Sequence, residues 1–146
     1  MDLFAGSGAL GLESLSRGAA HVTFVERDAA AVRELRARLT EWGATGGNVE
    51  QMDAVRFLAH GAAGGGAGAE GPFDIAFLDP PFGSDLLAEA SVRLEQGHWL
   101  APEALIYIEC AARNGLPPLP AGWSVAKAKE AGEVGYHLLT RALRGT

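Results

Sequence analysis

The chain opens with a glycine pattern that restricts its fold more than any other stretch of the sequence. Its first eleven residues, MDLFAGSGALG, place Asp2, Gly6, Gly8 and Gly11 in the spacing D-x-x-x-G-x-G-x-x-G. Glycine lets a backbone turn tightly and approach a ligand with no side chain between them. Between an apolar strand end and a helix, this pattern is typical of a turn that holds a nucleotide against the amides of the helix N-terminus. A plain turn is the alternative, because the pattern is short and the chain contains 20 glycines.

Length and composition predict one globular domain over 1–146. Of the 146 residues, 48% are hydrophobic and 21% charged, as in ordinary soluble proteins. Cys110 is the only cysteine, which excludes an internal disulfide and a multi-cysteine zinc site, so we expect no metal and a cytoplasmic location. No stretch approaches the ~20 apolar residues of a membrane span, and we expect no membrane partner. The net charge of -6 argues against broad, nonspecific nucleic-acid binding, which needs a positive surface.

Strand and helix patterns alternate along the chain. Residues 1–4 are interpreted as the end of a strand that is too short to be complete by itself. Further strands are predicted over 21–26, 49–52, 73–78 and 104–109, followed by a hairpin of 124–129 and 134–140 around Gly132. Helices are predicted over 9–17, from a cap at Asp28 to Trp42, after Asp53, and from a cap at Ser84 or Asp85 to about 96.

One tract interrupts this alternation. Residues 61–71 are almost entirely glycine and alanine, so the tract has little side-chain surface to bury and a high backbone entropy. We predict a flexible loop that is most simply a tolerated insertion, with a functional lid as the alternative.

The order of these elements predicts an α/β fold. Its sheet should be mostly parallel, with an antiparallel C-terminal hairpin and a first strand represented only by its end. Ligands in such sheets bind at the C-terminal ends of the strands. Four polar landmarks fall at or just beyond strand ends: the Gly6 and Gly8 turn, Glu26, Asp53 and Asp79. We therefore predict one binding site at this edge of the sheet.

Two of the landmarks are carboxylates that suit an adenosine. Glu26 lies twenty residues after Gly6, where a carboxylate accepts hydrogen bonds from both ribose hydroxyls. The alternatives are an exposed strand-end acid or an ion pair with Arg27 or Arg33. Asp53 is placed to accept a hydrogen bond from an adenine amino group, and equally to cap the helix that follows it. Both NAD and S-adenosyl-L-methionine (SAM) contain adenosine, so these two residues fit either ligand.

The tetrapeptide Asp79-Pro80-Pro81-Phe82 separates the two ligands. Each proline fixes φ and lacks an amide donor, so this proline corner offers carbonyls that only accept hydrogen bonds. A carboxylate beside rigid acceptors predicts a socket for an amino group, and the aromatic ring can stack on a flat base. A rigid turn with Phe82 in the core and Asp79 as a cap is the alternative. A dehydrogenase has no need for such a socket.

Together, these motifs resemble a known family. The segments DLFAGSGALGLESLSRGA, VERD, LDPPF and EALIYIE are similar to the RsmD family of bacterial 16S ribosomal RNA (guanine-N2) methyltransferases. The similarity extends over nearly the whole chain outside 61–71. It implies a Rossmann-like SAM-dependent methyltransferase that acts in the cytoplasm, as a monomer, on 16S rRNA in an assembling small ribosomal subunit.

The resemblance also implies a role for each candidate residue. The cofactor-binding residues surround the glycine turn and the next two strand ends: Asp2, Ala5, Gly6, Gly8, Glu26, Asp53 and Ala54. The catalytic residues are those of the proline corner: Asp79, Pro80, Pro81 and Phe82. Hydrogen bonds from the guanine N2 amine to Asp79 and to the Pro80 carbonyl would aim the amine at the methyl group, and Phe82 would stack on the extruded base.

The sequence departs from the family pattern at its start. Family members begin several tens of residues earlier, with a basic RNA-contacting segment and the whole first strand. We therefore expect a shortened chain that lacks this RNA-binding extension. The alternatives to guanine methylation are a methyltransferase for another planar amine (adenine N6 in DNA, or a glutamine), an NAD-dependent oxidoreductase, and a non-catalytic scaffold that binds SAM or RNA.

Overall fold

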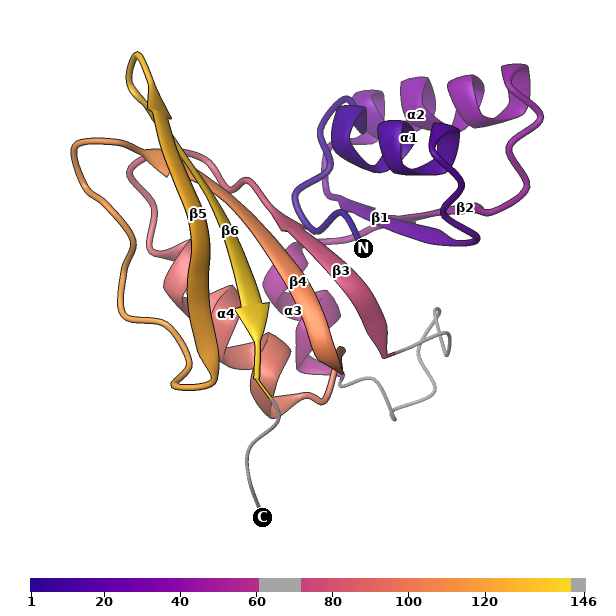
Figure 1. Ribbon diagram of the computed structural model, residues 1–146. Helices are drawn as coiled ribbons and strands as arrows, with labels where there is room; N and C mark the ends of the chain where they lie inside the picture. Colours follow the sequence, from indigo (N-terminus) through magenta and orange to yellow (C-terminus); the bar gives the residue numbers. More distant parts are fainter. Residues whose placement is uncertain (61–71, 143–146) are drawn as a thin grey trace.

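The computed structural model describes residues 1–60 and 72–142 (Figure 1). The predicted flexible loop at 61–71 lies outside the described residues. The elements follow the predicted order: α1 (Ala9–Ser16), β1 (Val22–Glu26), α2 (Ala29–Glu41), β2 (Gly47–Gln51), α3 (Ala54–Ala59), β3 (Phe73–Leu78), α4 (Leu86–Gln96), β4 (Leu100–Ala111), β5 (Trp123–Ala131) and β6 (Val134–Arg141).

The strands pair as the α/β prediction requires. β1 pairs in parallel with β2, and β3 pairs in parallel with β4. β6 lies between β4 and β5 and pairs antiparallel with both, which gives the orders β2–β1 and β3–β4–β6–β5. The predicted parallel sheet with an antiparallel C-terminal hairpin is confirmed.

The N-terminal segment 1–5 joins these two groups of strands. Asp2 forms parallel bridges with Phe24 of β1 on one side and with Phe77 of β3 on the other. The amides of Asp2 and Leu3 donate to carbonyl groups of the same two strands, at 2.8 and 3.2 Å. Residues 1–4 therefore pair as strand residues, as predicted, and lie between β1 and β3.

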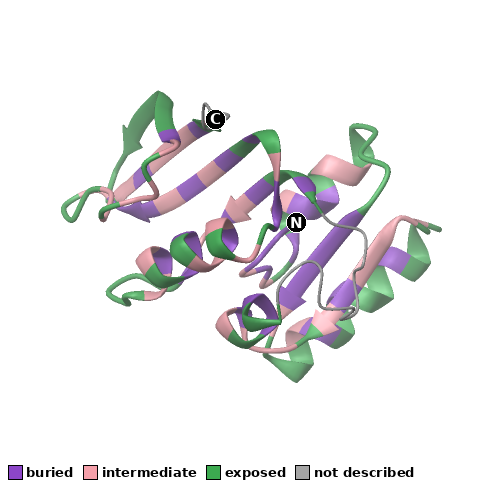
Figure 2. Ribbon diagram, turned by 90° about the horizontal axis from the view of Figure 1, so that it is seen from below, coloured by how far each residue is buried: buried purple, intermediate pink, exposed green. Residues whose placement is uncertain are grey.

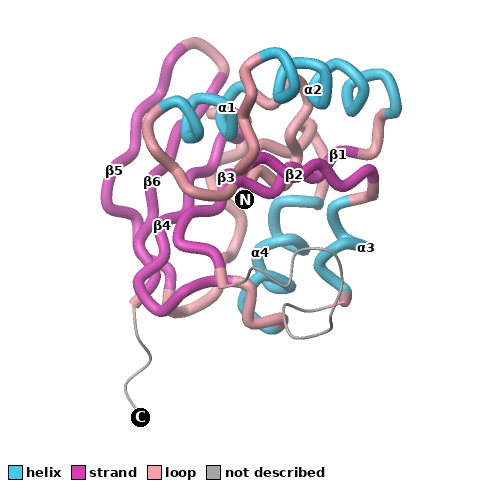
Figure 3. The backbone as a smooth tube through the Cα atoms, turned by 90° about the vertical axis from the view of Figure 1, so that its right-hand side faces the viewer, coloured by secondary structure: helices cyan, strands magenta, loops and turns pink. Residues whose placement is uncertain are grey.

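Helices cover both faces of the sheet. α1 and α2 lie over β1 and β2, whereas α3 and α4 lie on the opposite face (Figures 1 and 3). One buried cluster belongs to α1, α2 and the first two strands: Leu12, Val22, Phe24, Val32, Leu35, Leu39 and Val49. The other surrounds α3 and α4 and includes Phe57, Leu58, Leu78, Leu87, Leu94, Trp99, Ile106, Ile108 and Leu139. The outward helix faces and much of the hairpin are exposed (Figure 2). No helix in the two described ranges is both long and apolar enough to cross a membrane.

Two local predictions differ in detail from the structure. The helix predicted to extend to Trp42 ends at Glu41, and Trp42 is the C-cap residue and is 54% exposed. Asp85 is the N-cap residue of α4, as predicted, but neither its side chain nor that of Ser84 makes a capping hydrogen bond to the helix. Asp85 has φ -85° and ψ 7° rather than the extended conformation of a side-chain cap, and the Ser84 hydroxyl donates to the Pro81 carbonyl at 2.7 Å.

Candidate active site

The candidate site residues come from strand ends that lie in one row. Asp2 is bridged in parallel to Phe24 and to Phe77. Two residues further along each strand, Phe4 is therefore level with Glu26 on one side and with Asp79 on the other. The pairing of β3 with β4 extends this row to Glu109. Level residues of parallel strands project their side chains to the same face. The carboxylates of three strands therefore meet at one edge of the sheet, directly beside the glycine turn.

The glycine turn needs its three glycines for separate reasons. Gly6 and Gly8 have φ of 55° and 79°, which residues with a Cβ rarely adopt. A Cβ at Gly8 would also lie 2.5 Å from a methyl carbon of Leu35. At Gly11 it would lie 2.3 Å from the ring of Phe24, so this glycine lets α1 pack closely on β1. The predicted tight turn and close packing are confirmed.

Glu26 is held against the glycine turn. Its Oε1 accepts the Gly6 amide at 2.9 Å, and its Oε2 accepts the Asp28 amide at 2.8 Å. The alternative of an ion pair is not what the structure shows, since the salt bridges found within the described residues involve other acids. Each carboxylate oxygen can accept a further hydrogen bond. The ribose-binding role stays a prediction.

Asp2 and Ala5 support the turn through contacts within the protein. Asp2 is 2% exposed, and its Oδ2 accepts the Gly11 amide at 3.1 Å. Burial raises the pKa of Asp2 to about 6, and the hydrogen bond from Gly11 opposes this rise. The Ala5 amide donates to Val25, and its carbonyl accepts the Gly8 amide at 2.7 Å. Contact of Asp2 and Ala5 with the methionine end of a cofactor stays a prediction.

Asp53 caps α3, as one of its two predicted roles requires. Its Oδ1 accepts the Arg56 amide at 3.1 Å. Asp53, Ala54 and Glu26 line a common cavity of about 70 Å³, together with Met52 and others. Three of the predicted cofactor residues thus face the same space, and the adenine-binding role of Asp53 stays a prediction.

The proline corner borders a larger cavity of about 270 Å³. Pro80, Pro81 and Phe82 line it from one side and Glu109 from another, while the partly buried Asp79 lies immediately before this lining. Phe82 is 53% exposed, so the alternative that it fills the core is wrong. The cavity is slightly smaller than the ~300–1,000 Å³ of small-molecule sites, a size that suits one planar base.

Sequence reasoning missed two residues at this cavity, Glu109 and Tyr107. The Tyr107 hydroxyl donates to Glu109 Oε1 at 2.8 Å. Burial, and then the charge and hydrogen bonding of Glu109, raise the pKa of Asp79 to about 7, with a smaller contribution from Asp2. Burial and the hydrogen bond with Glu109 also raise the pKa of Tyr107. The available signal was positional, because Glu109 ends the predicted strand 104–109 just as Asp79 follows the predicted strand 73–78.

Comparison with solved structures identifies the fold. A methyltransferase structure from Geobacter sulfurreducens has a TM-score of 0.70 at 17% identity, over 97% of this chain and 69% of that one. The solved structure of yhhF from Escherichia coli has a TM-score of 0.89 at 45% identity, over 98% of this chain and 76% of that one. The fold is therefore that of the Rossmann-like methyltransferases.

Sequence comparison narrows this class to one family. A family model described as conserved hypothetical protein 95 matches residues 1–140. Ribosomal RNA small subunit methyltransferase D of Escherichia coli K12 is 45% identical over 145 residues, which are 99% of this chain and 69% of that protein. The protein of the same name from Haemophilus influenzae is 36% identical over 140 residues, which are 94% of this chain and 69% of that protein. The chain belongs to the RsmD family.

Proposed function

We propose that this chain transfers a methyl group from SAM to the exocyclic N2 of a guanine in 16S rRNA of the small ribosomal subunit. The observation that carries the proposal is the single row formed by Glu26, Phe4 and Asp79, which sets a carboxylate-anchored glycine turn beside the proline corner. The names of the relatives support ribosomal RNA as the substrate. The whole chain acts as one catalytic domain, in the cytoplasm and as a monomer.

The residues around the glycine turn fit SAM. Glu26 keeps acceptor positions for ribose hydroxyls although both of its oxygens already bind amides. The cavity beside it is lined by Asp53 and Ala54, and its other walls are mainly apolar, as an adenine ring requires. SAM supplies an electrophilic methyl group on a sulfonium, a leaving group that needs no acid.

The proline corner supplies the positioning of the acceptor. The guanine N2 amine is a weak nucleophile, because its lone pair is delocalised into the ring. Hydrogen bonds from the amine to the Asp79 carboxylate and the Pro80 carbonyl turn that lone pair toward the methyl carbon, and most of the rate enhancement comes from this alignment. Asp79, with its pKa near 7, is suited to take the proton that the amine releases after transfer. Phe82 stacks on the flipped base.

Replacing Asp79 with alanine tests this proposal. Asp79→Ala should lower methyl transfer to undermethylated small-subunit particles by about 100-fold or more, because the amine is no longer aligned. SAM affinity should change little in isothermal titration. Asp74→Ala is the control, since Asp74 is an exposed acid of β3 that lines neither of the two candidate cavities.

The product identifies the reaction. Mass spectrometry of digested RNA should find N2-methylguanosine. Full turnover by Asp79→Ala would exclude the assigned role of the corner. Methylation of DNA adenine or of a protein glutamine in preference to the particles would replace guanine as the acceptor, and SAM binding without turnover would indicate a scaffold.

A further inference from the structure

Glu109 is a carboxyl group at the acceptor cavity that the proposed binding of the amine does not use. Asp79 and Pro80 are enough to hold an amine, yet Glu109 lies level with Asp79 on the neighbouring strand and lines the same cavity as Pro80 and Phe82. An acid beside another acid is unfavourable when both are charged. The second carboxyl group therefore calls for an explanation beyond amine binding.

Glu109 is held in a defined orientation. The Tyr107 hydroxyl donates to Glu109 Oε1 at 2.8 Å. The Tyr107 ring in turn packs edge-on against Phe77 of β3, with ring centroids 6.1 Å apart. Two neighbouring strands thus fix the carboxylate of Glu109 at the wall of the cavity.

The two purines differ at the position next to the reactive amine. Guanine presents its N2 amine beside an N1–H donor, whereas adenine presents its N6 amine beside an N1 lone pair. If adenine is turned over relative to guanine, its N6 amine occupies the place of the guanine N2 amine. The proline corner by itself therefore does not distinguish the two bases. A carboxylate only accepts hydrogen bonds, and it therefore favours N1–H and repels the adenine lone pair.

We infer that Glu109 selects guanine over adenine by accepting the N1–H of the base whose N2 amine is held by Asp79 and Pro80. This inference rests on the proposed function, and it assigns the choice of base to a residue outside the proline corner. Tyr107 is a positioning residue for Glu109.

Selection of guanine in this way depends on pH. The groups that act on the pair of carboxyl groups are Asp2 from segment 1–5 and Tyr107 from β4, with Tyr136 of β6 acting on Tyr107. The pKa of Asp79 near 7 means that the pair holds a proton at lower pH. A protonated carboxyl group can donate to the N1 of adenine. Selectivity for guanine should therefore increase as the pH rises through about 7.

The test compares two small-subunit particles. One has guanine at the position that the wild-type chain methylates, and the other has adenine there, introduced by mutation of the rRNA gene. Both should come from a strain that lacks its own enzyme of this family. The ratio of kcat/KM for the two particles is measured at about pH 8.5, above the pKa of Asp79 near 7. Glu109→Gln keeps the shape of the side chain but offers both a donor and an acceptor. Glu103→Gln is the control, an exposed acid on the same strand.

For Glu109→Gln, we expect the guanine-to-adenine ratio to fall by roughly 5- to 150-fold, mainly through KM. Glu103→Gln should keep the wild-type ratio. Tyr107→Phe retains the carboxylate but loses its fixed orientation, so it should weaken guanine methylation by less than Glu109→Gln does. The wild-type chain adds a readout without any variant, because its ratio should fall as the pH is lowered through 7.

Two results would overturn the role of Glu109, and a third would overturn the proposed function. A folded Glu109→Gln, checked by thermal unfolding, that keeps the wild-type ratio would overturn it. If that variant does not fold, a wild-type ratio that stays constant from pH 6 to 8.5 overturns it instead. If the wild-type chain methylates no guanine N2 at all, the proposed function fails, which is a distinct outcome from a failure confined to the ratio.

Discussion

Asp2 is a buried carboxyl group whose charge is unfavourable in the folded protein. Burial raises its pKa to about 6 from 3.8, so the folded state binds the proton more tightly than the unfolded chain does. The stability contributed by the protonated form is fully present below about pH 4 and is lost as the pH rises toward 6. Two pKa units correspond to roughly 3 kcal/mol at neutral pH.

Asp2→Asn should therefore stabilise the protein at neutral pH. The asparagine oxygen can still accept the Gly11 amide, and the side chain carries no charge. We expect the free energy of unfolding to rise by about 1–3 kcal/mol near pH 7 and to change little near pH 4, as measured by urea denaturation. An equal change at both pH values would show that the effect does not arise from ionisation.

Glu26 is predicted to act on cofactor affinity rather than on the chemical step. Glu26→Ala removes the proposed ribose acceptor and frees the amides of Gly6 and Asp28. The Kd for SAM in isothermal titration should rise by about tenfold or more, while kcat at saturating SAM stays near the wild-type value. Glu34→Ala, an exposed substitution on α2, is the control. A large loss of kcat with unchanged SAM affinity would contradict the assignment.

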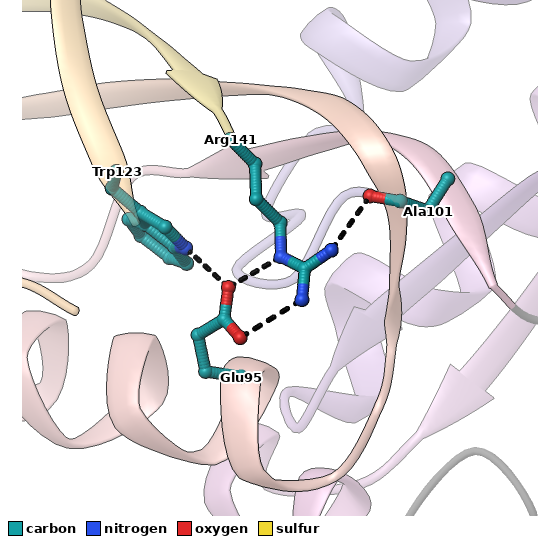
Figure 4. A network of polar contacts seen from close by, with 4 residues as sticks. All are labelled: Glu95, Ala101, Trp123 and Arg141. Atoms are coloured by element: carbon teal, nitrogen blue, oxygen red, sulfur yellow. Dashed lines mark hydrogen bonds and ion pairs between the residues drawn. The ribbon is translucent and has the colours of Figure 1, made fainter. Parts of the chain in front are cut away.

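At the scale of elements, a polar network ties α4 to the C-terminal hairpin (Figure 4). Glu95 at the end of α4 pairs with Arg141 of β6 and accepts the indole N–H of Trp123 at 2.8 Å. Arg141 also donates to the carbonyl of Ala101 at 3.2 Å. The side chains of the ion pair are only 20% and 15% exposed, so this pair is better shielded from water than an ordinary surface pair.

Arg141→Met should destabilise the protein, because it removes the guanidinium that pairs with the partly buried Glu95 and bonds the Ala101 carbonyl. We expect a loss of about 1–3 kcal/mol in the free energy of unfolding, measured by denaturant titration. Arg93→Met is the matched control. Its pair with Glu89 is 40% and 47% exposed, and its loss should stay below about 0.5 kcal/mol. Similar losses for both variants would mean that shielding does not matter here.

At the scale of the whole molecule, binding of the cofactor product should stabilise the fold. The proposed cofactor site draws on segment 1–5, the glycine turn, β1 and the start of α3, so a ligand there contacts elements that are distant in the sequence. S-adenosylhomocysteine at about 100 times its Kd should add about 2.7 kcal/mol and raise the Tm, whereas NAD should leave it unchanged. Protection by NAD alone would favour an oxidoreductase over the proposed methyltransferase.

Local patterns were enough to predict most elements of this fold. The alternation of strands and helices and the hairpin around Gly132 depend on apolar periodicity and turn chemistry, which act within a few residues of each other. The details that differed, the helical end at Trp42 and the side-chain cap of α4, concern helix ends, where the path of the chain beyond the helix decides which side chains reach the backbone.

The candidate site divides in the same way. Sequence by itself determined the strand-end positions of the glycine turn, Glu26, Asp53 and the proline corner, because backbone freedom, capping and rigid turns are local properties. Only the tertiary structure brought Glu109 beside Asp79 and joined it to Tyr107. These contacts depend on the register between β3 and β4, which are separated in sequence by α4, and burial and charge between such distant residues appear only when the sheet has formed.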